Sequence, residues 1–297
     1  MANIDIIHIP FSRYGAYVSV TGNACDNTTS YAKELIIHSA RRRFSEGPTF
    51  SLTFGANEAE EFSCSASPEA LKVSNKNGRV CIYVRDDDTL AFESEGLDLH
   101  FRLLHYGYGT ETGNQSFRII SGVLSLYSTF RVVQGKAKLD GPYLDNEAKE
   151  PRNHKTMLDI RCEEGKILAA VSICSVEPKD IKLPIEPKKE IAAIREEWEA
   201  FSSIFPDLKQ ADNETENFMQ ITQYNLWSCF VRAQGIYKND TILMSKKNMT
   251  STWSWDHCFN ALAMAHLKDK KIAKEIAFNQ FLAPFHLQSE HGVLPDM

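Results

Sequence analysis

The sequence predicts a protein of two parts, an antiparallel β-sandwich followed by helical hairpins. In its first 177 residues, many short segments alternate apolar and polar side chains, as half-buried strands do. Beyond a proline-rich stretch, apolar side chains recur at helical spacing instead. The 297 residues are enough for two domains. We therefore expect a sandwich over residues 1–177, a linker with a helix over 178–210, and a helical region over 211–297.

The strand signals include two hairpins. Residues 97–103 alternate at period two, and so do Val80, Ile82 and Val84. Asn77-Gly78, a dipeptide that tolerates positive φ, predicts a hairpin with residues 71–73. The polar residues 163–165 predict another between 157–162 and 167–174. Further strands are expected at 117–127 and 129–133, whereas 32–43 fits either a helix or a strand. Many short strands in one block favour sheets packed face to face.

The helical part begins after a linker marked by Pro178, Pro184 and Pro187. Four apolar residues then fall at i, i+3, i+7 and i+10 and predict a helix that Pro206 ends: Ile191, Ile194, Trp198 and Phe201. A second helix is expected from a cap at Asp212 or Asn213 to Gln234, with Gly235 at its exit. Residues 239–252 read as a loop or a short extended segment, in which Lys246 and Lys247 are solvated. A third helix is expected over 255–267 and a fourth over 269–281, before Pro284.

Composition excludes several classes of protein. A net charge of −6 without a long basic block argues against a nucleic-acid partner, and the short Arg41–Arg43 run reads as a solvated surface. No apolar run spans a bilayer and no secretory signal begins the sequence, so a cytoplasmic protein without a membrane partner is expected. The seven cysteines are scattered and read as reduced thiols. No metal or other cofactor is expected, because nucleotide-binding motifs are absent and residues 86–88 lack calcium-loop spacing and read as a solvated acidic loop.

The residues that carry chemistry are Trp253-Ser254-Trp255-Asp256, a W-x-W-D motif at the start of the third predicted helix. Indole faces pack on the C–H faces of a pyranose, and a carboxylate accepts hydrogen bonds from adjacent hydroxyls. If Trp255 packs inward with Phe259, Leu262 and His266, Asp256 lies about 100° away, at the mouth of the helix. The alternative is that Asp256 only caps the helix and that both tryptophans belong to the core.

The same stretch resembles glycoside hydrolase family 63 and its relatives. The resemblance covers about 50 residues: the W-x-W-D motif, Phe259 and an Ala-rich helix, Asp269 with Ala273, Gln288, and Gly292 to Asp296. It implies a six-hairpin (α/α)6 barrel that processes α-glucosides, α-mannosides or similar compounds. These enzymes commonly carry an N-terminal β-sandwich, so the chain would hold a sandwich and the first hairpins of an incomplete barrel.

The resemblance also implies roles for individual residues. Asp256 would hold hydroxyls of the sugar in the −1 subsite, and Trp253 would contact the same sugar. Asp296 would lie near the mouth of the barrel. Trp255, Gln288 and His291 are further candidates, although Gln288 can instead cap a turn and His291 can be a surface histidine.

The catalytic pair is expected elsewhere. Enzymes of this family invert, with a carboxylic acid and a carboxylate set about 6.5–9.5 Å apart. The resemblance places both downstream of Met297, so we expect this chain alone to be inactive. Two alternatives stay open: a disaccharide phosphorylase of similar architecture, and a non-catalytic carbohydrate-binding or scaffold protein. The sugar, its linkage and the oligomeric state are not predicted.

Overall fold

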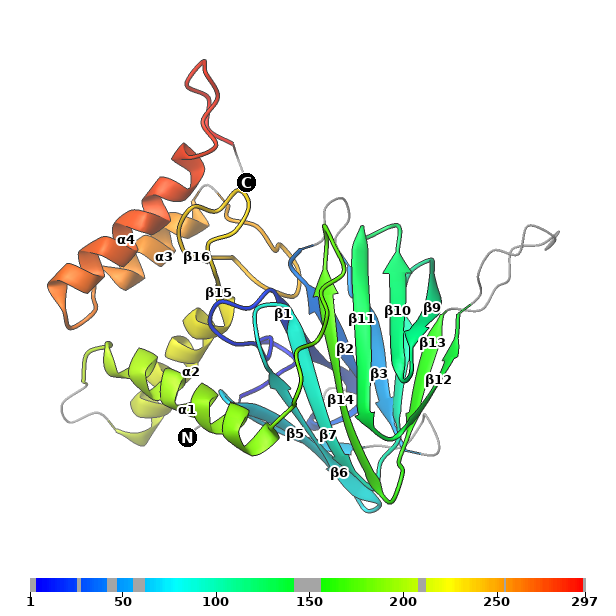
Figure 1. The fold of residues 1–297 in the computed structure, drawn as a ribbon. Coiled ribbons are helices and arrows are strands. Elements are labelled where there is room, and N and C mark those ends of the chain that lie inside the picture. The colour runs from blue at the N-terminus through cyan, green and yellow to red at the C-terminus, as the bar shows by residue number, and fades with distance from the viewer. Residues whose placement is uncertain are drawn as a thin grey trace.

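A computed structural model describes residues 4–25, 28–41, 47–55, 62–141, 156–207, 212–253 and 255–295. The described strands, in chain order, are β1 Val18–Cys25, β2 Thr28–Ser39, β3 Phe50–Phe54, β4 Phe62–Ser67, β5 Ala70–Asn75, β6 Gly78–Val84, β7 Thr89–Glu95, β8 Leu99–Leu103, β9 Gly107–Gly113, β10 Ser116–Ser121, β11 Leu126–Gln134, β12 Lys136–Asp140, β13 Met157–Arg161, β14 Lys166–Cys174, β15 Phe230–Val231 and β16 Thr241–Ile242. The helices are α1 Pro187–Ser203, α2 Asn213–Cys229, α3 Asp256–Met264 and α4 Lys270–Phe285. Figure 1 shows all four on one side of the sheets.

The β part is antiparallel throughout its named strand pairs. Its hydrogen-bonded order is β12-β13-β8-β3-β2-β4-β5-β6-β7-β14-β11-β10-β9, with β1 paired to β2. Phe101 of β8 packs edge-on against Phe92 of β7 at 5.2 Å and against Phe130 of β11 at 5.1 Å. Because β8 is not adjacent to β7 or β11 in that order, these rings meet across the interior. The arrangement is mainly antiparallel sheet and is consistent with the predicted sandwich.

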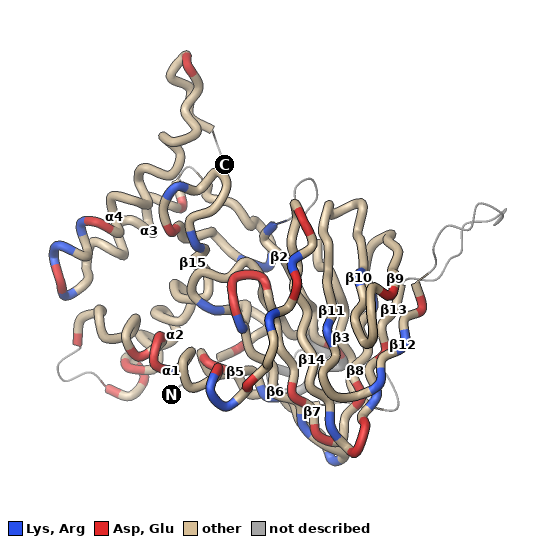
Figure 2. Tube along the Cα trace, in the orientation of Figure 1, with Lys and Arg blue, Asp and Glu red and all other residues tan. Residues whose placement is uncertain are grey.

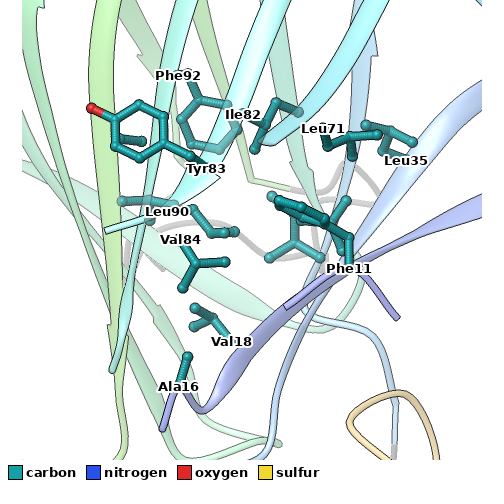
Figure 3. Packing of buried hydrophobic residues seen from close by; sticks show 14 of the residues in the cluster. Phe11, Ala16, Val18, Leu35, Leu71, Ile82, Tyr83, Val84, Leu90 and Phe92 are labelled. Carbon is teal, nitrogen blue, oxygen red and sulfur yellow. The ribbon is translucent and has the colours of Figure 1, made fainter. Parts of the chain in front are cut away.

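The N-terminal segment extends this core. Phe11 bridges to Val20 through paired backbone hydrogen bonds of 2.8 and 2.9 Å. Figure 3 shows Phe11, Ala16 and Val18 packed beside Val84 and Leu90 of the sheet. Burial of these side chains is the main favourable term in folding the β part.

Several strand predictions are confirmed or refined. The predicted hairpin at Asn77-Gly78 is confirmed, since it joins β5 to β6. The predicted hairpin between 157–162 and 167–174 is wrong: β13 pairs with β8 and β12, whereas β14 pairs with β7 and β11, so the 163–165 turn leads from one part of the sheet to another. The ambiguous 32–43 segment lies in β2 as far as Ser39, and Arg42 and Arg43 lie outside the described residues. The expected strand 117–127 is wrong as one unit: β10 ends at Ser121 and a turn over 122–125 leads into β11. Ser125 takes a φ of 53° in that turn, which a strand does not allow.

The helices match the predicted ones with shifted ends. Asp212 caps α2 by accepting from the Thr215 amide at 2.8 Å, as expected. α2 ends at Cys229 rather than Gln234, because residues 230–231 pair with β16 instead. α4 continues through Pro284, where the missing proline N–H affects only the last turn. No helix among the described ranges is long and apolar enough to cross a membrane.

An aromatic cluster joins the helices to the sandwich. Trp198 of α1 packs edge-on against Trp227 of α2 at 5.6 Å, and Tyr14 of the N-terminal segment lies 4.7 Å from the Phe230 ring. Phe201 contacts both Tyr14 and Trp227. Ion pairs at the rim, such as Arg85 with Glu190 at 2.9 Å, add to the contact of α1 with the sheet. The linker helix is therefore packed on the sandwich rather than free of it.

Candidate functional site

The W-x-W-D residues lie where the loop after β16 enters α3. The carbonyl oxygen of Trp253 accepts two hydrogen bonds from His257, one from its backbone N–H at 3.2 Å and one from its Nδ1 at 2.8 Å. His257 is buried and its ring faces Phe281 of α4 at 6.5 Å. One side chain thus ties the loop to the start of α3 and to the end of α4.

Asp256 is the first residue of α3 and is half-buried. Its carboxylate makes no hydrogen bond or ion pair with any described residue. The residue at the N-cap is Trp255, whose side chain makes no capping bond. The alternative in which Asp256 merely caps α3 therefore finds no support in the hydrogen bonds. The free N–H groups of a helix start favour negative charge nearby.

The two tryptophans differ in exposure. Trp255 is 65% exposed and packs edge-on against Phe259 at 5.7 Å. Trp253 is half-buried, and its indole N–H is buried without an acceptor among the described residues. Buried indole N–H groups usually find a partner, so this donor is an exception.

The predicted packed face of α3 is wrong. Trp255, Phe259, Leu262 and His266 are all exposed, and α3 buries His257, Ala261 and Met264 instead. α3 packs on α4 through that second face, since the two helices form an antiparallel hairpin (Figure 1). An apolar row is consequently left uncovered on the opposite side, and α4 adds Phe278, Phe281 and Phe285 to the exposed apolar surface.

The downstream candidates lie at the same end of this hairpin as Asp256, but they do not form one site with its carboxylate. Gln288 is exposed and its Nε2 donates to the Gly292 carbonyl at 2.8 Å, so it caps a turn. Gly292 takes a φ of 81° in that turn, a conformation that favours glycine. His291 is exposed beside Glu290. Asp296 lies outside the described residues.

The prediction that Lys246 is solvated is wrong. Lys246 is completely buried, and its Nζ donates to the carbonyl oxygens of Phe230 and Arg13 at 2.7 and 3.2 Å and to the hydroxyl of Ser12 at 3.2 Å. Burial lowers the pKa of Lys246 to about 7. Lys247 is half-buried and donates to the Ile7 carbonyl at 3.2 Å. The loop that leads to Trp253 is thus fastened to the N-terminal segment.

A buried glutamine of α4 holds the same loop through two hydrogen bonds. Gln280 of α4 accepts from the Ile242 amide at 2.9 Å and donates to the Asp240 carbonyl at 3.0 Å. These two hydrogen bonds therefore fix the position of the helical hairpin relative to β16. Gln280 and His257 were not singled out from the sequence, and Lys246 was predicted there only as a solvated charge. Only the position of His257 beside the motif was a signal, because the other two depend on partners far away in the chain.

The acidic residues 86–88 form a paired turn rather than a solvated loop. Asp88 is buried and pairs with Arg41, whose guanidinium also stacks on the Tyr17 ring. Asp86 pairs with Lys179 at 3.0 Å, and Asp87 pairs with Arg232 at 3.1 Å. Figure 2 shows this turn between β6 and β7 in red. The described part of the chain holds no group of three or more potential metal-binding side chains.

Comparison with known proteins gives a likeness of fold. No protein-family model matches the sequence, and no curated protein matches it. Among solved structures, a GH92-family glycosyl hydrolase, ccman5, is similar with a TM-score of 0.53 and 11% identity, covering 82% of this chain and 42% of that one. A bacterial glucoamylase complexed with acarbose aligns with a TM-score of 0.45, 11% identity, and coverage of 99% and 52%. A family 81 glycoside hydrolase from Clostridium thermocellum has a TM-score of 0.37, 9% identity, and coverage of 58% and 24%.

The likeness to the GH92-family enzyme shows a shared fold and nothing about chemistry. The chain spans less than half the length of that enzyme. A specific relation to family 63, and a six-hairpin barrel, stay predictions of the sequence.

Proposed function

We propose that the chain supplies the β-sandwich and the first helical hairpins of a glycoside hydrolase of the inverting α-glycosidase type, acting on α-glucosides or α-mannosides. The observation that carries the proposal is the Asp256 carboxylate, which lies at a helix start directly after Trp253 and Trp255 and has no hydrogen-bond or ion-pair partner among the described residues. The fold likeness to a GH92-family glycosyl hydrolase supports the architecture.

In this proposal residues 1–177 form the sandwich, 178–210 the linker and 211–297 the beginning of the barrel. The exposed apolar residues of α3 and α4 are suited to packing against further helical hairpins. Asp256 and Trp253 hold the sugar, with Trp255 and Asp296 as additional contacts, whereas Gln288 maintains the turn after α4. The acid and the base of the inverting reaction are not assigned to any described residue.

Sugar binding by the chain itself tests the proposal. Methyl α-glucoside and methyl α-mannoside would be titrated while tryptophan fluorescence and calorimetric heat are followed. We expect binding in the millimolar range and a fluorescence change from Trp253 and Trp255. Asp256→Asn is expected to weaken binding about tenfold, because it replaces charge-assisted hydrogen bonds with neutral ones. Asp180→Asn is the matched control, since Asp180 is exposed in the linker.

Three outcomes would contradict the proposal in different ways. Equal binding by wild type and Asp256→Asn would remove Asp256 from the site. Tight oligosaccharide binding that no change at Trp253 or Asp256 affects would assign the sugar site to the sandwich and favour the carbohydrate-binding protein. Turnover of an α-disaccharide only in the presence of phosphate would favour the phosphorylase.

A further inference from the structure

Two arginines on the outer face of the sandwich have no acidic partner. Arg118 on β10 and Arg131 on β11 are both half-buried, and their Nε–H groups are buried without an acceptor among the described residues. Arg131 donates from Nη1 to the Asn114 carbonyl at 3.1 Å, and no hydrogen bond or ion pair joins Arg118 to another described residue. A guanidinium has donors only, so its buried N–H groups need an oxygen from elsewhere.

A third unpartnered donor lies between them. Thr129 is 4% exposed, and its Oγ1 has no hydrogen-bond partner in the described part of the chain. The strand register places Thr129 directly opposite Arg118 and Arg131 opposite Ser116. Side chains two residues apart share a face of a strand, so all three point to the same side. Directly opposed Cβ atoms lie about 5 Å apart and diagonal ones about 7–8 Å, within the reach of two guanidinium groups.

This side of the sheet is the outer one. Phe117, Ile119, Phe130 and Val132, which alternate with the three residues, belong to the buried core. The neighbours that the register places beside the three are neutral: Thr110 on β9, Ser116 on β10, and Ala170 and Ser172 on β14. None of the four described helices lies over β9, β10 or β11 (Figure 1). The four neutral neighbours therefore do not compensate the positive charge of the pair.

We infer that Arg118, Thr129 and Arg131 form a binding site for an oxyanion, a sulfate or phosphate group either free or carried by a carbohydrate. Three donors on one face of the sheet, each without an acceptor among the described residues, match the oxygen atoms of such a group. The planar fork of arginine binds oxyanions by paired hydrogen bonds, and a bound anion also relieves the repulsion between the two cations. The site lies on the sandwich and does not depend on the sugar site proposed at Asp256.

Titration of the 297-residue protein with inorganic sulfate at constant ionic strength tests the inference. The Nε–Hε signals of the arginines would be followed by NMR. We expect the Arg118 and Arg131 signals to move together and to saturate with a single Kd. Arg118→Lys and Arg131→Lys keep the charge but remove the fork, and each is expected to raise the Kd about tenfold or more. Arg79→Lys is the control, because Arg79 is exposed and already paired with Glu95.

Thr129→Val is a second, nearly isosteric variant that removes one donor, and we expect the Kd to rise several-fold. Signals that move without saturation, or an equal rise in Kd for Arg79→Lys, would overturn the inference. A sulfated disaccharide and its desulfated form separate the two sources. Tighter binding of the sulfated sugar than of inorganic sulfate would support a carbohydrate-borne group. Weaker binding would support a free anion at the same site.

Discussion

The Nδ1 atom of His257 lies 2.8 Å from the carbonyl oxygen of Trp253, one turn earlier in the chain. The same oxygen also accepts from the His257 backbone amide, so a single buried side chain fixes the angle at which the tryptophan loop enters α3. Asp256 lies inside this turn. The orientation of its carboxylate thus depends on a neighbour that need not touch a ligand.

His257→Phe tests this positioning. Phenylalanine preserves a ring beside Phe281 but removes the hydrogen bond from Nδ1. We expect sugar binding to weaken several-fold, whereas the free energy of unfolding falls by only about 1 kcal/mol, the net value of one hydrogen bond. Calorimetric titration and urea denaturation measure the two effects. His266→Phe, on the exposed side of α3, serves as the control. Unchanged sugar affinity in His257→Phe would show that the bond does not position Asp256.

Gln280→Leu tests how the helical hairpin is held. The side chain of Gln280 is completely buried and bonds both the amide of Ile242 and the carbonyl of Asp240. Leucine leaves both backbone groups buried without a partner, at about 1–3 kcal/mol each. We expect the midpoint of urea unfolding to fall accordingly. Lys274→Leu places the same side chain on the exposed surface of α4 and should change the midpoint little. Equal effects of the two changes would contradict a role for these hydrogen bonds.

The uncovered apolar row of α3 predicts self-association. Phe259 and Leu262 are 59% and 58% exposed. Phe259→Ser with Leu262→Ser should therefore reduce association and the binding of an apolar dye, with a small change in stability. Light scattering and dye fluorescence measure these effects. Met264→Ser changes a buried residue of the same helix and should destabilise the protein instead. A large loss of stability in the double variant would mean that the row is covered.

Local sequence patterns predicted the helices, strands and turns better than they predicted what packs around each of them. The Asn77-Gly78 hairpin and the Asp212 cap follow from short-range chemistry, and both are present. The face of α3 could not be read in this way. Its apolar residues occupy two sides of the helix, and periodicity alone does not say which side α4 covers. The prediction for Lys246 was wrong for a related reason. A lysine in a polar loop is expected to be solvated, but the three oxygen atoms that bind this one come from residues 12, 13 and 230, far away in the sequence.

The surroundings of Lys246 predict that the free energy of unfolding depends on pH. The Ser12 hydroxyl donates to the Val18 carbonyl, so toward Lys246 it acts as an acceptor, as do the carbonyls of Arg13 and Phe230. Three acceptors take all three hydrogens of an ammonium group. Burial nevertheless disfavours the charge and lowers the pKa of Lys246 from 10.5 to about 7. Cys229 and Asp87 are the other titratable groups that act on it, and both favour the charged form.

The sign of the pH effect follows from these two pKa values. Between pH 7 and 10 the unfolded chain keeps the Lys246 proton and the folded protein releases it. The free energy of unfolding therefore rises with pH, by up to about 1.4 kcal/mol per pH unit. Below pH 7 both states are protonated and the slope vanishes. Lys246→Met removes this contribution. We expect the difference in unfolding free energy between wild type and Lys246→Met, measured by urea denaturation from pH 6 to 9, to grow in favour of wild type above pH 7.

Lys247→Met provides the matched control, because the neighbouring lysine is only half-buried and donates to a single carbonyl. The free energy of unfolding of Lys247→Met should change with pH as that of the wild type does, since Lys246 is still present. The subtraction also removes the titration of groups common to all three proteins, including the cysteines and the other lysines. A difference that stays flat across pH 7 to 9 would mean that Lys246 keeps its proton throughout. In that event the three oxygen acceptors stabilise the ammonium group enough to outweigh its loss of hydration.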